Sequence, residues 1–209
     1  ATLMDTNNLI DEIYNALPKN KRRIHQNIVQ SGEANNPLAY YIDIMNWLRN
    51  SKSNSTSELK IHKIRSPTAF VSFMDGLTKI EYTPDIVVAS IHDDILNKNP
   101  GPGESGEFED RPTKFTLKLN NGEKATYVLD SAIIRDTKAT HFCSLLTCQG
   151  AGMGFDGESF SRISNFDWKP LINTNKEWTF KGSTWKGTKT PIKWNFRNGY
   201  QLLFYYRVN

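Results

Sequence analysis

A histidine and an aspartate have the spacing of two side chains that meet across a β-hairpin. His141 opens the apolar run HFCSLLTC, and Asp156 follows fifteen residues later, after a glycine-rich turn. Two antiparallel strands joined by that turn would bring the two side chains together. An aspartate that accepts a hydrogen bond from one imidazole nitrogen fixes the tautomer and leaves the other nitrogen free as a base. The pair therefore supplies two of the three groups of a nucleophilic triad, although such pairs are also common in hairpins without catalysis.

Two other motifs resemble a phosphate-binding loop and a metal site, but neither has the surroundings that such a site requires. The GAGMG segment at residues 150–154 resembles a phosphate-binding loop, but no helical pattern follows it. Such a loop needs a helix N-terminus for the phosphate, so we interpret the segment as a tight turn between strands. His92, Asp93 and Asp94 are adjacent, and three adjacent side chains rarely point to one ion. No metal site and no cofactor are expected.

The chain contains only two cysteines, Cys143 and Cys148. This number excludes a disulfide scaffold and a zinc site built mainly from thiolates. Cys143 lies two residues from His141, so both side chains share one face of the predicted strand, whereas Cys148 lies on the opposite face. We interpret both cysteines as small apolar fillers.

Composition limits the class of protein. The 209 residues carry 26 lysines and arginines against 22 acidic residues, a surplus of +4 that is too small and too spread out for a nucleic-acid footprint. No apolar run is long enough to span a membrane, and the first residues do not resemble a signal peptide. Lysines alternate with aromatic residues near the end of the chain. This pattern is typical of the core and rim of a sheet, with a weak surface for single-stranded nucleic acid as the alternative.

The elements that position these residues change in type along the chain. Apolar residues repeat with helical spacing at 9–17, at 38–49 and after Pro67. From residue 85 the pattern becomes that of strands. A hairpin turn is predicted at 120–122 and a surface loop at about 97–113. The predicted strands are 85–91, 115–119, 125–129, 131–135, 142–148 and 201–208.

Helices followed by an antiparallel sheet predict an α+β fold. We expect one domain over residues 1–209, with a mainly helical lobe at 1–80 and a mainly β lobe at 81–209.

The histidine segment resembles the histidine box of the ubiquitin-specific proteases. The resemblance runs from His141 through HFCSLLT and the turn to GFDG at 154–157 and to Arg162-Ile163. The end of the chain, GYQLLFYYR at 199–207, looks like the terminal strand of that family. PDIVV at 84–88 looks like the start of its palm, and SPTAF at 66–70 sits where the family has a helix. The composition, which is rich in asparagine and lysine, resembles that of deubiquitinase-like domains of large DNA viruses.

This resemblance implies a papain-like cysteine peptidase fold, with an N-terminal helical lobe and a C-terminal antiparallel β-sheet. It implies that His141 is the general base and that Asp156 orients it. Under this hypothesis Gly150, Gly152 and Gly154 line a narrow channel for a Gly-Gly tail, because backbone approaches closely only where side chains are absent.

The chain departs from the family at the nucleophile. The family's cysteine sits at the N-terminus of a helix, which stabilises a thiolate. Met4-Asp5-Thr6 looks like the tail of that box, which places the nucleophile at Thr2, or at Ala1 if the spacing is stretched. Neither is a cysteine, so three explanations stay open: replacement by alanine to trap a complex, omission of residues upstream, or a natural pseudoenzyme.

The sequence therefore predicts a deubiquitinase-like thiol hydrolase that cleaves after the C-terminal glycine of ubiquitin or a ubiquitin-like protein. The alternatives are an inactive module that binds ubiquitin or another partner, and a viral structural or nucleic-acid-associated protein. We expect ubiquitin or a relative as partner, no membrane and no nucleic acid. The expected location is the cytoplasm, that of the host if the protein is viral, or the virion.

Overall fold

The computed structural model of the chain describes residues 61–65, 83–91, 111–118, 122–138, 141–197 and 200–208, with backbone only at 61–65, 90 and 91. The chain divides into two compact units, Ala1–Leu59 and Lys60–Asn209, and every described residue belongs to the second. The three predicted helices, most of the predicted loop at 97–113 and the His92 cluster lie outside the described residues. The single-domain organisation stays a prediction.

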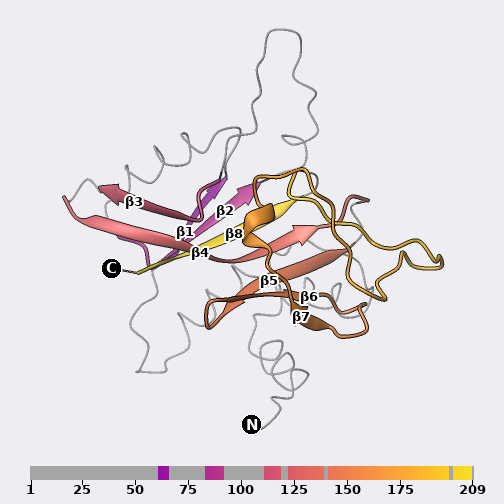
Figure 1. The fold of residues 1–209 in the computed structure, drawn as a ribbon. Helices are drawn as coiled ribbons and strands as arrows, with labels where there is room; N and C mark the ends of the chain where they lie inside the picture. The colour runs from indigo at the N-terminus through magenta and orange to yellow at the C-terminus, as the bar shows by residue number, and fades with distance from the viewer. Residues whose placement is uncertain are drawn as a thin grey trace, which may run out of the picture. The chain divides into compact units, whose positions relative to one another are not determined.

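The described part of the chain forms one eight-stranded sheet (Figure 1). Its strands run in the order β1-β2-β8-β4-β5-β6-β7, and β3 pairs with β4 beside this path. The β1–β2 pair is parallel and all the other pairs are antiparallel. The strands are β1 (Ile61–Arg65), β2 (Ile86–Ile91), β3 (Lys114–Lys118), β4 (Lys124–Arg135), β5 (Phe142–Cys148), β6 (Ala151–Phe155), β7 (Ile163–Asn165) and β8 (Gln201–Arg207).

This sheet corrects the predicted fold class. The described residues contain no α-helix, and their strands are nearly all antiparallel, so the prediction of an α+β, papain-like fold is wrong. The prediction depended on helical spacing in the first 80 residues, whereas the described residues follow the period of two that suits strands. The described residues include no helix of the length and hydropathy that a membrane span requires.

Several strands form where the residue pattern predicts them. Val87, Val88 and Ala89 are all buried in β2, as expected for an uninterrupted apolar strand with both faces covered. In β3, Phe115 and Leu117 point into the core while their neighbours are exposed. The two strands predicted at 125–129 and 131–135 are one strand, β4, with a register shift between Leu129 and Ser131.

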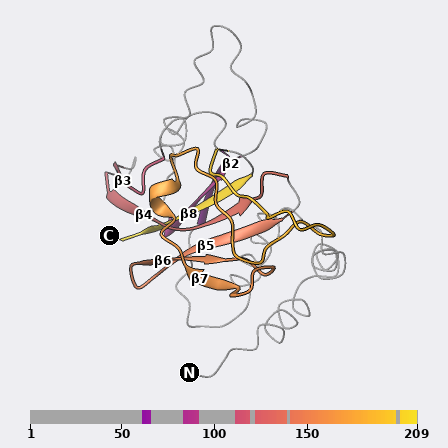
Figure 2. The ribbon, with the colours of Figure 1, turned by 45° about the vertical axis from the view of Figure 1, so that its right-hand side comes forward.

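The core lies between the sheet and the segment from residue 166 to 197, which is mostly irregular and carries the short 3-10 helix η1 (Lys169–Leu171) (Figure 2). Trp168, Trp194 and Phe196 are fully buried, and Trp178 and Phe180 nearly so. Their rings contact one another with centroids 5.2–6.3 Å apart. The tryptophans of this segment are therefore core residues, as the sequence pattern favours, and are not available to stack on bases.

Candidate active site

The β5–β6 hairpin brings His141 and Asp156 together. His141 immediately precedes β5, and Asp156 immediately follows β6, its antiparallel partner. Nε2 of His141 lies 2.6 Å from Oδ1 of Asp156. The close approach predicted from their spacing is confirmed.

The turn of this hairpin is shorter than predicted. Cys148 pairs with Ala151, so only Gln149 and Gly150 connect the strands. Their φ angles are 49° and 83°, and two consecutive positive φ angles are typical of the tightest hairpin turns. Residues 151–154, expected to belong to the turn, instead form most of β6.

Asp156 is buried and accepts hydrogen bonds on both carboxylate oxygens. Oδ1 accepts from Nε2 of His141 and, at 3.2 Å, from the backbone N–H of Glu158. Oδ2 accepts from the hydroxyl of Ser183. Burial by itself raises the pKa of Asp156, but hydrogen bonds from His141 and Ser183 outweigh it, and the net pKa is lowered. The carboxylate is therefore ionised at neutral pH.

His141 is held through both its backbone and its ring. Its N–H donates to Oδ1 of Asp136 at 2.8 Å, and its carbonyl accepts from the N–H of Asp136 at 2.8 Å. Its ring centroid lies 6.1 Å from that of Trp194. The hydrogen bond to Asp156 raises the pKa of His141 against the opposing effect of burial. With Nε2 occupied and the side chain 27% exposed, Nδ1 is the nitrogen that can exchange a proton with a substrate.

The two cysteines differ in their surroundings. Cys143 is buried in β5, and burial raises the pKa of its thiol well above the ordinary value, with a further contribution from the charge of Asp156. It is an unreactive thiol in the core, which confirms its interpretation as a filler. Cys148 is exposed, so the same interpretation is wrong for it.

The three glycines expected to line a substrate channel meet different surroundings. A Cβ on Gly152 would lie 2.4 Å from the carbonyl oxygen of Phe166, and one on Gly154 would lie 2.5 Å from the ring of Phe180. Both glycines make room for the protein's own residues. Gly150 faces open space in the turn. Their contact with a substrate stays a prediction.

The remaining predicted site residues cannot be placed. Ala1 and Thr2 lie outside the described residues, so their part in the site stays a prediction. Within the described ranges, no group of three or more histidine, cysteine or acidic side chains could hold a metal ion.

The sequence pattern did not predict two residues of the site, Asp136 and Ser183. Asp136 is buried and accepts hydrogen bonds from the N–H groups of Lys138 and His141, which tie the residue before β5 to the residue after β4. An aspartate before a short polar segment is a recognisable turn signal that could have identified it. Ser183 contacts Asp156 from 27 residues away and has no local signal.

Solved structures resemble the chain only weakly. A yeast SAGA DUB module that contains a mutant Sgf73 is 15% identical, with a TM-score of 0.39 over 71% of this chain and 33% of that chain. An essential yeast splicing factor is 9% identical, with a TM-score of 0.48 over 89% and 53%. The Ubp8-Sgf11-Sgf73-Sus1 SAGA DUB module is 15% identical, with a TM-score of 0.37 over 98% and 49%.

The chain thus spans between about a third and half of the chains that it resembles. No protein family matches the sequence, and neither does any curated protein. At this level of likeness the comparisons carry no argument about function, so the site geometry must carry it.

Proposed function

We propose that the chain is a thiol hydrolase domain that cleaves the bond after the C-terminal glycine of ubiquitin or a ubiquitin-like protein. The observation that carries the proposal is the 2.6 Å hydrogen bond between Nε2 of His141 and Oδ1 of Asp156. The histidine-box pattern around these two residues supports the choice of substrate. Origin and cellular location stay predictions.

His141 serves as the proton carrier in this mechanism. A cysteine thiolate attacks the carbonyl carbon of the last glycine, and a C–S bond forms. The C–N bond then breaks as Nδ1 of His141 gives its proton to the leaving amine. Water then attacks the thioester carbon and gives a proton to Nδ1, a C–O bond forms, and the C–S bond breaks with the thiolate as leaving group. The thiolate–imidazolium pair is restored, and the glycine carboxyl group releases its remaining proton to solvent. Asp156 stays ionised and stabilises the imidazolium.

Neither cysteine of the chain is suited to supply this thiolate. Cys148 is exposed but ends β5, at the opposite end of the strand from His141. Cys143 is a buried thiol with a raised pKa, which is unsuited to nucleophilic attack. The family pattern puts the nucleophile at Thr2 or Ala1, and neither side chain carries sulfur.

The missing sulfur favours a second candidate, a module that binds ubiquitin or a relative without cleaving it. In this case the His141–Asp156 pair stabilises the hairpin but transfers no proton.

Restoring the sulfur tests the first candidate. We expect Ala1→Cys or Thr2→Cys to hydrolyse a fluorogenic amide at the ubiquitin C-terminus, where the unchanged chain does not. Adding His141→Ala should lower the new activity by on the order of 10²-fold or more, because proton transfer contributes 10²–10⁴-fold.

The matched control for His141→Ala is Lys193→Ala, which removes an exposed cation from the same half of the chain. It should leave the rate unchanged. Failure of both cysteine variants to cleave, or cleavage that survives His141→Ala, would overturn the hydrolase. Titration of 15N-labelled ubiquitin with the unchanged chain then tests the binding module, which requires shifts of ubiquitin amide resonances.

A further inference from the structure

The Asp156 carboxylate has a side-chain partner besides His141 that the proposed mechanism does not use. Its Oδ2 accepts a hydrogen bond from the Ser183 hydroxyl, on the opposite oxygen from His141. Ser183 is only 1% exposed, and Asp156 is fully buried. No substrate can reach this hydroxyl, so any role of Ser183 must act through Asp156.

The backbone of Ser183 is fixed on both sides. Its N–H donates to the carbonyl of Phe180 at 3.1 Å, and its carbonyl accepts from the N–H of Ile192 at 3.1 Å. An isolated antiparallel β-bridge between Thr184 and Pro191 pairs the two ends of the same loop. The hydroxyl therefore reaches Asp156 from an anchored position.

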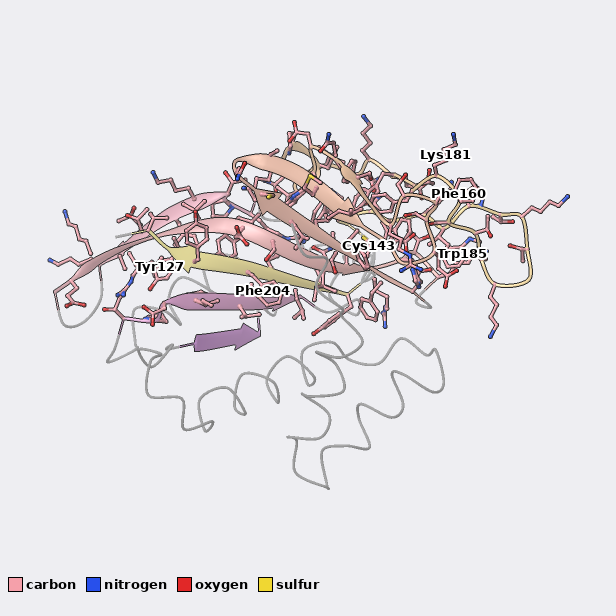
Figure 3. All side chains as sticks on the ribbon, turned by 90° about the horizontal axis from the view of Figure 1, so that it is seen from below. Tyr127, Cys143, Phe160, Lys181, Trp185 and Phe204 are labelled. Carbon is pink, nitrogen blue, oxygen red and sulfur yellow. The ribbon has the colours of Figure 1, made fainter. Side chains whose placement is uncertain are left out.

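The turn after Asp156 packs against the loop that carries Ser183. The N–H of Phe160 donates to the carbonyl of Lys181 at 3.0 Å. Gly182 has a φ of 94°. A Cβ on Gly182 would lie 2.3 Å from a carbon of the Phe160 ring, so the ring occupies the space that a side chain would need. Phe160 is nevertheless 79% exposed, so its ring covers Gly182 from the solvent side. Figure 3 shows Phe160, Lys181 and Trp185 gathered at one end of the sheet.

These contacts decide which way the carboxylate faces. A carboxylate bonded on one oxygen only can rotate about its terminal torsion, which has broad minima. A second bond on Oδ2, from an anchored donor, keeps Oδ1 directed at Nε2 of His141. Hydroxyl donation also stabilises the ionised form.

We propose that Ser183 is a positioning residue of the active site, whose hydroxyl fixes the Asp156 carboxylate so that it holds Nε2 of His141 and leaves Nδ1 to carry the proton. This role in catalysis rests on the proposed function. The positioning itself is a property of the folded chain and can be measured without activity.

The test compares Ser183→Ala with Ser159→Ala. Ser159 also donates to Asp156, but to its backbone carbonyl, at 2.8 Å, so Ser159→Ala removes a hydrogen bond without touching the carboxylate. The readout is the low-field proton resonance of the His141 Nε2–H group and the pH at which it disappears on acidification. We expect Ser183→Ala to broaden or abolish the resonance, or to move its loss to higher pH. Ser159→Ala should resemble the unchanged chain.

Ser183→Thr keeps the hydroxyl and should restore the resonance. If Ser183→Ala unfolds, as judged by its amide spectrum, Ser183→Cys repeats the test with a weaker donor and a smaller expected effect. A resonance in the folded Ser183→Ala or Ser183→Cys chain that matches the unchanged chain in intensity and acid midpoint would overturn the proposal.

The activity arm separates this proposal from the proposed function. In a cleaving Ala1→Cys or Thr2→Cys chain, Ser183→Ala should lower kcat by on the order of 10²-fold and leave KM unchanged, because a misplaced base acts on the chemical step. An unchanged kcat would overturn the catalytic role of Ser183. If neither cysteine chain cleaves, the proposed function fails, and the NMR arm alone decides the positioning.

Discussion

Nε2 of His141 and Oδ1 of Asp156 are 2.6 Å apart, and the two side chains differ sharply in solvent access. The carboxylate is fully buried, while the imidazole is 27% exposed. The buried charge therefore acts on a ring that solvent and substrate can still reach. This asymmetry allows the pair to combine a fixed orientation with proton exchange at Nδ1.

Removing the charge of Asp156 should lower the pKa of His141. Asp156→Asn keeps the shape of the side chain but loses the negative charge that stabilises the imidazolium, while the burial that lowers the pKa remains. NMR titration of the His141 ring resonances measures the change.

Asp167→Asn is the control, because Asp167 is exposed and lies in the same half of the chain. It should leave the titration of His141 unchanged. A pKa of His141 that stays raised in Asp156→Asn would contradict the assignment of its cause.

The same pair should make stability depend on pH in a defined window. The pKa of His141 is raised on folding, so its stabilising contribution is complete below about pH 6.5 and is lost as pH rises through the folded value. The pKa of Asp156 is lowered, so its contribution is present above about pH 3.8 and is lost as pH falls through the folded value. The His141–Asp156 pair therefore stabilises the folded state most between about pH 4 and pH 6.5.

Urea unfolding of the unchanged chain and of His141→Gln measures this contribution. The difference in unfolding free energy should reach about 1.5–3 kcal/mol in that window and narrow on both sides of it. Lys193→Gln, which breaks an exposed ion pair with Glu177, should cost less than about 1 kcal/mol. A difference for His141→Gln that is constant from pH 4 to pH 9 would refute the linkage.

The two thiols should react at very different rates. Cys148 is exposed, whereas Cys143 is buried with a raised pKa. We expect one equivalent of thiol to react with a disulfide reagent in the folded chain and two in denaturant. Cys148→Ser should abolish the native reaction and Cys143→Ser should not; rapid modification of Cys143 in the folded chain would show that it is accessible.

The sequence allowed accurate prediction of features that depend on neighbouring residues. The bounds of β5 were predicted without error, and the meeting of His141 and Asp156 followed from one hairpin. Both depend on alternation and on a glycine turn, which act over a few residues.

Features that depend on distant contacts were missed. β1 pairs in parallel with β2, and such a pair has no hairpin to reveal it. β6 contains two glycines in five residues and was interpreted as a turn, because its pairing with β5 outweighs its low strand propensity. The contact between Ser183 and Asp156 depends on how an irregular loop packs, which no periodic pattern encodes.

The glycines of the hairpin should differ in their tolerance of a methyl group. Gly152 lies where β6 meets the backbone of Phe166, whose N–H donates to the carbonyl of Gly152 at 2.9 Å. An alanine there would place Cβ 2.4 Å from the carbonyl oxygen of Phe166, and backbone cannot rotate away as a side chain can. Gly152→Ala should destabilise the chain by about 1–3 kcal/mol or more. Gly157→Ala meets no atom within 4 Å and has no positive φ, so it should stay within about 0.5 kcal/mol of the unchanged chain in urea unfolding. Equal stability of the two variants would show that the β6 backbone does not approach Phe166 as closely as described.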